Sequence, residues 1–188
     1  MDTKIIIFVS ILIILFFGMM IGIYNSLVVL KNRVKNAYAQ IEVQLKRRHD
    51  LIPNLIETVK GYMHHEAEIF KSITEARAKA MQISKDAKVQ SSNEKTLSSA
   101  LTSLFAVCEN YPDLKASQNF LALQEELVST ENKIGFARQF YNDSVMQYQT
   151  KKEIFPNNIF CLIFNFKDYS MFEVTNSNER NVVEVNLG

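Results

Sequence analysis

Residues 5–23 read IIIFVSILIILFFGMMIGI, an apolar stretch near the start of a chain of 188 residues. The stretch contains no charge, and Ser10 is its only polar side chain. As a helix it would be about 28 Å long, close to the hydrocarbon thickness of a bilayer. A cleaved signal peptide would have a shorter apolar region that ends in a small-x-small cleavage site, which this stretch lacks. We therefore expect residues 1–23 to anchor the chain in a membrane.

Basic residues are distributed unequally around this stretch. Lys4 precedes it, whereas Lys31, Arg33 and Lys35 follow it closely. Because Lys and Arg beside a span favour the cytoplasmic side, the count predicts a single-pass protein of the cell (inner) membrane with its soluble part in the cytoplasm. A periplasmic or extracellular placement stays open, since the terminal amine adds charge to the other side and long domains can be exported whatever their charge.

After the anchor, apolar residues recur at helical steps of three and four, a pattern typical of helices that pack against one another. The first apolar stripe, over residues 27–45, continues the anchor helix. We expect this helix to end near residues 48–50, where Asp50 would cap a second helix with Pro53 in its first turn. The stripe of that second helix covers residues 52–87.

Two further helices are predicted after a polar connection. Ser91 and Glu94 have the spacing of a capping box at the start of the third helix, which Pro112 would end. Asp113 would cap the fourth helix, whose apolar stripe continues until Pro156. Each proline therefore lies at a boundary between predicted elements.

The chain has 5 Gly and 3 Pro, far fewer than an all-β protein needs for its turns. We expect an all-α fold in which the N-terminal transmembrane helix continues into an antiparallel up-and-down four-helix bundle over residues 24–155. The apolar segment 156–174 contains IFCLIFNF at residues 159–166, which is too short to span a bilayer. It should pack on the bundle, dip into the membrane surface or contact a partner, and packing on the bundle is the simplest of these interpretations. Residues 175–188 are expected to form a mobile tail.

Composition argues against several classes of function. Lys+Arg 21 and Asp+Glu 20 give a net charge of +1, without the basic surface of a nucleic-acid-binding protein. Cys108 and Cys161 are too few for a disulfide framework and have no metal-ligand spacing. Gly61 and Gly135, the glycines of the predicted bundle, form no phosphate-binding loop. We expect no cofactor, no catalytic residue and no evident small-molecule substrate.

The three histidines and their neighbours are the remaining candidates for catalysis or metal binding. Adjacent helical positions point about 100° apart, so His64 and His65 are poorly placed to share one ion. Neither the two-histidine spacing of zincins nor the Glu-x-x-His spacing of di-iron bundles is present. His49 beside Asp50 fits a helix boundary better than a catalytic pair. The alternative function is a metal-dependent hydrolase that uses His49, Asp50, His64, His65 and Glu66.

Glu66 is the one charge at an apolar position of the second stripe, where a carboxylate needs a cationic partner or access to water. Its candidate partners are Arg48, Lys133 and Arg138. The basic residues 46–48 would lie about 35 Å from the end of the span, beyond the reach of attraction to lipid headgroups. We expect these basic residues to face protein or solvent.

Several blocks of the sequence resemble the LemA family of bacterial membrane proteins. They are YNSLV at 24–28, LKNRV at 30–34, AYAQIEVQLKRRHDLIPNLIETVKGYMHHE at 37–66, ENYPDLKASQNFLALQEELVSTENKIGFARQFYND at 109–143 and IFPNNIF at 154–160. The resemblance covers residues 24–172, although Tyr38 stands where many members have Trp and the tail follows no family pattern. It implies an N-terminal anchor and a helical bundle, offers no catalytic residues to carry over, and makes an accessory role beside other envelope proteins an expectation.

The predicted function follows from the anchor, the long regular stripes and the lack of chemical motifs. We expect a protein without enzymatic activity that serves as a membrane-tethered scaffold or adaptor for envelope-associated proteins, or that self-associates through helices of the coiled-coil type. Its other predicted partner is the lipid bilayer, which residues 5–23 would contact. No nucleic acid is expected.

Overall fold

The computed structural model describes residues 3–82 and 87–172, so the expected tail at residues 175–188 lies outside the described part. Every regular element within the described part is a helix, which confirms the prediction of an all-α fold. The helices are α1 (Thr3–Lys60), α2 (Ala67–Ala80), α3 (Ala87–Cys108), α4 (Pro112–Lys115), α5 (Gln118–Glu153) and α6 (Asn157–Ile163).

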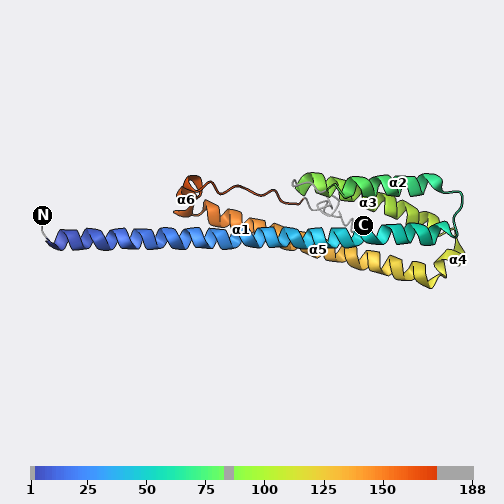
Figure 1. Cartoon of the computed structure of the whole chain (residues 1–188), viewed down its shortest axis with the longest axis horizontal. Coiled ribbons are helices and arrows are strands. Elements are labelled where there is room, and N and C mark those ends of the chain that lie inside the picture. The colour runs from blue at the N-terminus through green and yellow to red at the C-terminus, as the bar shows by residue number, and fades with distance from the viewer. Residues whose placement is uncertain (1–2, 83–86, 173–188) are drawn as a thin grey trace, which may run out of the picture.

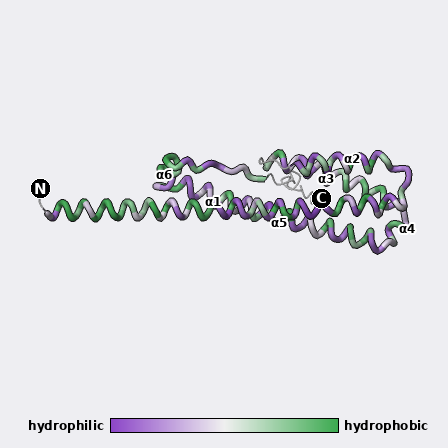
Figure 2. Tube along the Cα trace, in the orientation of Figure 1, coloured by the Kyte–Doolittle hydropathy of each residue, from purple (hydrophilic) through white to green (hydrophobic). Residues whose placement is uncertain are grey.

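The molecule is a long rod built around α1 (Figure 1). α5 runs back along α1 in the opposite direction, and α2 and α3 form a hairpin beside the C-terminal part of α1. The short helix α4 lies between the end of α3 and the start of α5. The N-terminal part of α1 extends beyond the other helices and is the most continuously hydrophobic part of the rod (Figure 2). The long apolar N-terminal helix that the sequence predicts is therefore present.

α1 continues without interruption through residues 48–50, where the sequence predicted a boundary. Pro53 lies inside the helix, and its missing N–H leaves the carbonyl group of His49, four residues earlier, without an intrahelical donor. The guanidinium of Arg77 on α2 supplies that donor, with Nε 2.8 Å from the carbonyl oxygen of His49. The predicted boundary is wrong because a side chain from a neighbouring helix satisfies the exposed carbonyl.

Replacing Arg77 with methionine should lower the free energy of unfolding by about 1–3 kcal/mol, because the His49 carbonyl would lose its donor in a partly buried position. Lys79→Met, at an exposed position of the same helix, is the matched control and should change the stability by less than about 0.5 kcal/mol. Urea unfolding of the full chain in detergent micelles, followed by circular dichroism, measures both. Equal effects would show that α1 accommodates Pro53 without this bond.

The second predicted helix is also interrupted. α1 ends at Lys60, residues 61–66 form a connection, and the stripe of residues 52–87 is divided among α1, α2 and the first residue of α3. Gly61, a weak helix former, follows the last residue of α1. α3 begins at Ala87, so Ser91 and the residues after it lie within the helix and the predicted capping box is not a helix start.

The apolar stripes form the buried faces of the helices, in two clusters of side chains. The first cluster lies where α1 meets α2, α3, α4 and the start of α5, and it includes Ile52, Leu55, Ile73, Leu97, Leu104, Leu114, Phe120 and Leu127. The second lies mainly between α1 and α5 and includes Val34, Ile41, Leu45, Ile134, Tyr141, Val145 and Tyr148. The rod is therefore thickest around the C-terminal part of α1, and nearer the apolar end α1 and α5 are its long helices.

Residues 164–172, which we call the C-terminal segment, run back from α6 along the α1–α5 pair (Figure 1). Side chains of α5 hold its backbone: Tyr148 and Tyr141 donate their hydroxyl groups to carbonyl oxygens of the segment at 3.0 and 2.9 Å. The amide group of Asn142 bonds both the N–H and the C=O of Phe172, at 2.9 and 3.0 Å. The segment thus covers one side of the thin part of the rod.

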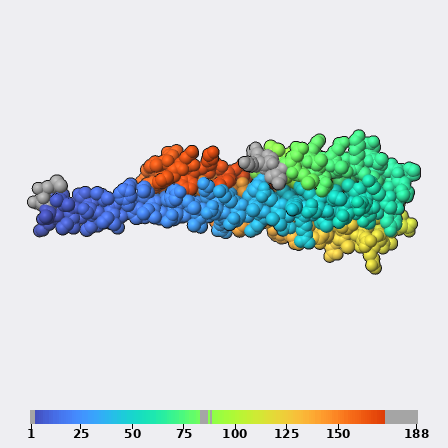
Figure 3. Space-filling view, viewed as in Figure 1, coloured from blue at the N-terminus to red at the C-terminus, as the bar shows by residue number. Residues whose placement is uncertain are grey.

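α6 lies against the apolar part of α1, beside the end of α5 that is far from α4, and α1 extends beyond it towards the N-terminus (Figure 1). The ring centres of Phe160 and Phe16 are 6.3 Å apart, and those of Phe164 and Tyr24 are 5.1 Å apart. The space-filling view shows the orange-red surface of this C-terminal region seated on α1 (Figure 3). The structure therefore brings residues from the two ends of the sequence together.

Candidate functional site

A cluster of charged and polar side chains lies where α1, α3 and α5 meet, and all of its members except Glu131 are buried. Arg48 and His49 belong to α1, Gln90 and Glu94 to α3, and Glu131 to α5. The exposed fractions of Arg48, His49 and Glu94 are 4%, 6% and 1%. Charged side chains are rarely buried to this extent unless they are paired. We call these five residues the ionic cluster.

Glu94 is the centre of the ionic cluster. Its Oε1 atom lies 3.0 Å from Nε2 of His49 and accepts a hydrogen bond from Nε2 of Gln90 at 3.2 Å. Its Oε2 atom lies 3.5 Å from Nη1 of Arg48, which is also 2.8 Å from Oε2 of Glu131. Both carboxylate oxygens of Glu94 therefore have partners on neighbouring side chains.

The ionic cluster constrains how the helices fit together. Moving charges out of water costs several kcal/mol for each ion, so a buried pair adds little net stability even when its geometry is good. A shift of α3 along α1 by one turn would leave Glu94 buried without Arg48 and His49, which is far more costly. The cluster therefore penalises other registers of α3 on α1 more than it stabilises the native one.

Sequence reasoning did not identify Glu94 as a buried residue. The apolar stripe of the third helix, at Leu97, Leu101 and Leu104, extends back at helical spacing to residue 94. That spacing is the signal that could have found it. The capping-box interpretation instead placed Glu94 in the first turn of a helix that in fact begins at Ala87.

Glu66, expected to face a basic side chain, has different partners. The expected partners were Arg48, Lys133 and Arg138. The carboxylate of Glu66 instead accepts hydrogen bonds from the hydroxyl group of Tyr111 and, at 3.1 Å, from the backbone N–H of His65. The bond from Tyr111 lowers the pKa of Glu66 below its ordinary value. The prediction is wrong because the break between α1 and α2 takes Glu66 out of the apolar stripe.

Arg138 lies between the ionic cluster and the C-terminal segment. Its Nε and Nη2 atoms are buried without a hydrogen-bond partner. Burial lowers the pKa of its guanidinium, and the nearby charges of Glu131 and Glu94 act in the opposite direction. The guanidinium also lies over the ring of Phe172, 5.7 Å from its centre. Nearby negative charge and the face of an aromatic ring therefore both favour the charged form of this guanidinium.

The residues of the hydrolase alternative are not brought together. His49 is part of the ionic cluster and Asp50 is exposed on α1, whereas His64 and His65 are exposed in the connection that follows α1. Across residues 3–82 and 87–172, no three His, Cys, Asp or Glu side chains are grouped so that they could hold a metal ion. The arrangement gives the hydrolase alternative no support.

A cavity of about 440 Å³ adjoins the ionic cluster. It lies between α1, the end of α2 and the start of α3. His49 and Gln90 belong to both the cavity and the cluster. The apolar part of the lining includes Ile41, Leu45, Met81 and Phe172. The cavity is thus mainly apolar with polar groups of the ionic cluster at its wall.

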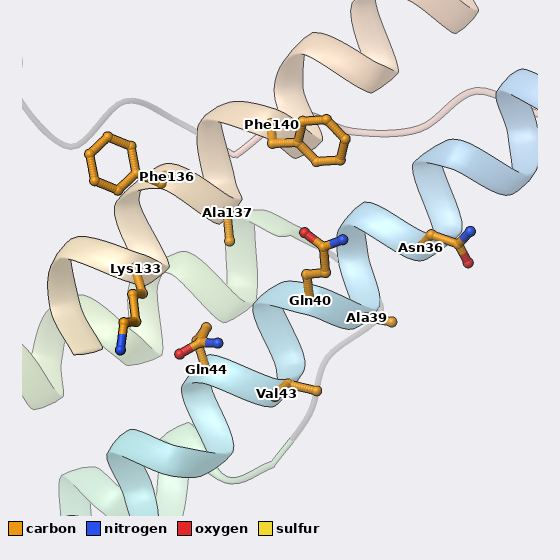
Figure 4. Close-up of a pocket in the computed structure, with 9 residues that line it drawn as sticks. All are labelled: Asn36, Ala39, Gln40, Val43, Gln44, Lys133, Phe136, Ala137 and Phe140. Atoms are coloured by element: carbon orange, nitrogen blue, oxygen red, sulfur yellow. The ribbon is translucent and has the colours of Figure 1, made fainter. Parts of the chain in front are cut away.

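A groove of about 630 Å³ runs between α1 and α5 (Figure 4). α1 contributes Asn36, Ala39, Gln40, Val43 and Gln44, and α5 contributes Lys133, Phe136, Ala137 and Phe140. The side chain of Phe136 is 72% exposed, and Oε1 of Gln44 is buried without a hydrogen-bond partner. An exposed aromatic ring near an unpaired acceptor is typical of a surface that another molecule covers.

The fold and these surfaces define a helical protein with one candidate membrane span. Within the described residues, α1 is the single helix long and apolar enough to cross a membrane, and its most apolar window is 0% buried. The LemA family model matches residues 37–187, and the chain belongs to the LemA family. The resemblance found in the sequence blocks is confirmed.

Individual relatives agree with this assignment. Protein LemA of Metamycoplasma hominis is 27% identical over 170 residues, which cover 86% of this chain and 78% of that protein. Magnetosome protein MamQ 2 of Paramagnetospirillum magneticum is 22% identical over 175 residues, which cover 80% of this chain and 64% of that protein. Magnetosome protein MamQ of Magnetospirillum gryphiswaldense is 21% identical over 174 residues, which cover 79% and 64%. The chain thus spans a little under two thirds of the length of these magnetosome proteins.

Proposed function

We propose that the protein is a scaffold or adaptor without enzymatic activity, anchored in the cell (inner) membrane by residues 5–23. Its first helix would continue into an antiparallel four-helix bundle in the cytoplasm, where it binds envelope-associated proteins or further copies of itself. The observation that carries the proposal is an exposed, uncharged face of α1 that the chain does not use for its own packing.

This face, which we call the outer seam, follows a coiled-coil repeat. Its eight residues alternate at steps of four and three, and they are Gly18, Gly22, Asn25, Val29, Asn32, Asn36, Ala39 and Val43. All eight are exposed. Val29 is about 140° around the helix from Val34, which α1 buries in the second core cluster. A repeat of 3.5 residues keeps one side of a helix facing a partner helix along its length.

The residues of the outer seam suit helix–helix contact. Nothing lies within 4 Å of a Cβ built on Gly18 or Gly22, so another helix can approach the backbone closely. Asn25 and Asn32 carry amide groups that both donate and accept hydrogen bonds, so each can pair with its counterpart in a second copy. The groove continues this surface towards the exposed ring of Phe136. Two copies in one membrane would present their seams at the same height because α1 runs unbroken from the span.

Cysteine crosslinking tests this proposal at single residues of α1. The buried native thiols Cys108 and Cys161 are first replaced by alanine, and Asn36→Cys is introduced on the outer seam. Mild oxidation of native membranes should join this cysteine to its counterpart in a second copy, or to a cysteine of another protein that lies against the seam, since a disulfide needs two thiols whose Cα atoms lie within about 7 Å. The matched control is Lys35→Cys, an exposed neighbour about 100° away on the same helix. Its yield of crosslinked product should be at least about tenfold lower.

The crosslinking results separate the parts of the proposal. A product of twice the chain mass identifies self-association, and a product of another mass identifies a different partner. No product at Asn36→Cys, or equal products at both positions, would contradict self-association through the outer seam. Labelling of Lys35→Cys by a membrane-impermeant thiol reagent only after the cells are permeabilised would support the cytoplasmic placement, and labelling in intact cells would contradict it.

A further inference from the structure

α6 buries one side and exposes a strongly apolar side. Asn157, Phe160 and Cys161 are buried. The exposed fractions of Ile159, Leu162 and Ile163 are 49%, 85% and 67%, and that of Phe155, just before the helix, is 75%. Such a group of large apolar side chains marks a surface that lipid or another molecule covers.

This apolar surface lies level with the end of the candidate membrane span. Phe160 contacts Phe16, and Tyr24 contacts Phe164 and Phe166 with ring centres 5.1 and 5.8 Å apart. Phe16 is seven residues before the end of the apolar stretch at Ile23, a distance of about 10 Å along α1. α6 therefore lies beside the part of α1 that would be inside the bilayer, on the side of the soluble part.

Charged residues from several elements lie at one level, where the apolar surface ends. Residues 154–166 contain no charge, whereas Lys152 and Glu153 precede them and Lys167 and Asp168 follow. Lys152 forms an ion pair with Asp168, so the two ends of this uncharged stretch lie close together. Lys31, the first charge of α1 after the span, has its Nζ 5.7 Å from the centre of the Phe166 ring. A boundary between charged and uncharged residues shared by α1, α5 and the C-terminal segment is what a water–lipid interface requires.

We propose that α6, together with Phe155, inserts into the same bilayer that α1 crosses, in the leaflet that faces the soluble part of the protein. The apolar side chains of α6 would contact the upper acyl chains, and the lysines at its level would lie among the headgroups. The contact between Phe160 and Phe16 lies about 10 Å along α1 from the end of the span. This depth agrees with the roughly 5–10 Å to which interfacial helices are buried. The occupant is lipid because the exposed side of α6 is continuous with the lipid-facing surface of α1, and both are free of charge.

The backbone around α6 is suited to a medium without water. Groups that leave water must find hydrogen bonds within the protein. The N–H of Phe164 bonds the carbonyl oxygen of Phe160 at 2.9 Å, and the N–H of Phe166 bonds that of Cys161 at 3.2 Å. The side-chain amide of Asn157 bonds the carbonyl oxygen of Lys151 near the end of α5 at 2.8 Å. The turn from α5 into α6 and out of it thus satisfies several polar groups internally.

Tryptophan fluorescence provides a direct test because the chain contains no Trp. Leu162→Trp places a reporter at the most exposed position of α6, and the full chain is reconstituted at low density into phosphatidylcholine vesicles with brominated acyl chains. We expect this reporter to lose most of its emission, more with bromine near the headgroup end of the chain than near the methyl end. Phe155→Trp should behave alike. Leu121→Trp, 49% exposed near the start of α5, is the matched control and should keep its emission.

The inference rests on the membrane anchor of the proposed function, so Leu12→Trp in the span is included. If Leu12→Trp is quenched but Leu162→Trp and Phe155→Trp are not, the insertion of α6 is wrong and the anchor stands. If Leu12→Trp is not quenched, both the anchor and the insertion are wrong. If the α6 reporters resist both brominated lipid and aqueous iodide, a protein surface covers α6 and the lipid assignment is overturned.

Discussion

Replacing Glu94 with alanine is expected to lower the free energy of unfolding by about 3–5 kcal/mol, the usual cost of removing one partner from a buried ion pair. His49 and Arg48 would stay buried, with exposed fractions of 6% and 4%. His49 would lose the carboxylate that lies 3.0 Å from its Nε2 atom, and Arg48 would keep Glu131 as its remaining carboxylate partner. The loss is large because these groups cannot return to water without separating α1 from α3.

An exposed ion pair between α1 and α5 provides the control for this measurement. Glu126 on α5 pairs with Arg47, whose side chain is 52% exposed, and Glu126→Ala should cost less than about 1 kcal/mol. Glu94→Gln should fall between the two variants, since an amide can keep part of the hydrogen bonding but not the charge. Urea unfolding of the full chain in micelles gives all three values. Similar losses for Glu94→Ala and Glu126→Ala would mean that water reaches the ionic cluster and that it does not constrain the register.

The apolar stripes could be predicted because a buried helix face needs apolar side chains at regular steps, whatever it packs against. Ile41, Leu104 and Ile134 are buried for this reason, and each stands in a predicted stripe. The apolar N-terminal helix could be predicted on the same local grounds. Local sequence was enough wherever one helix alone determined the pattern.

The helix boundaries failed where a second helix supplies the deciding interaction. Pro53 is a reasonable helix start when α1 is considered alone, and it becomes an interior residue because Arg77 bonds the free carbonyl of His49. Arg77 is 28 positions further along the chain, and no local pattern connects the two. The boundary near residue 50 could not be rejected without the packing of α2 on α1.

The ionic cluster and the groove could not be predicted from the sequence because each depends on residues from more than one helix. Whether Arg48 is a solvated residue or a buried one depends on Glu94 and Glu131, which belong to two other helices. The groove depends on how α1 and α5 face one another near Phe136, since these two helices supply all of its lining residues. The outer seam was visible in principle as a second repeat on α1. The buried stripe of the same helix is more hydrophobic and therefore gives the stronger signal for helix packing.

The second large effect is expected at Phe172, the residue that fixes the C-terminal segment to the rod. Its side chain is 3% exposed, and its ring centre lies 5.3 Å from that of Tyr141 and 6.2 Å from that of Tyr38. Phe172→Ala should weaken the attachment of the segment by about 3 kcal/mol, at the lower end of the cost for a buried phenylalanine. Hydrogen exchange of residues 164–172 should then become about 100-fold faster. Met171→Ala, at an exposed neighbouring position, should change it little.

The ionisation of Tyr141 provides a second measurement of how firmly the C-terminal segment is attached. Burial raises the pKa of Tyr141 to about 12, from an ordinary value of 10.0. Because the raised pKa belongs to the folded state, this tyrosine stabilises the attached segment below pH 10 and loses that contribution as the pH rises towards 12. In Phe172→Ala, the pKa of Tyr141 should fall towards 10, which an absorbance titration of tyrosinate detects. An unchanged titration together with unchanged exchange would mean that Tyr148 and Asn142 hold the segment without Phe172, and that its attachment depends on backbone hydrogen bonds rather than on aromatic packing.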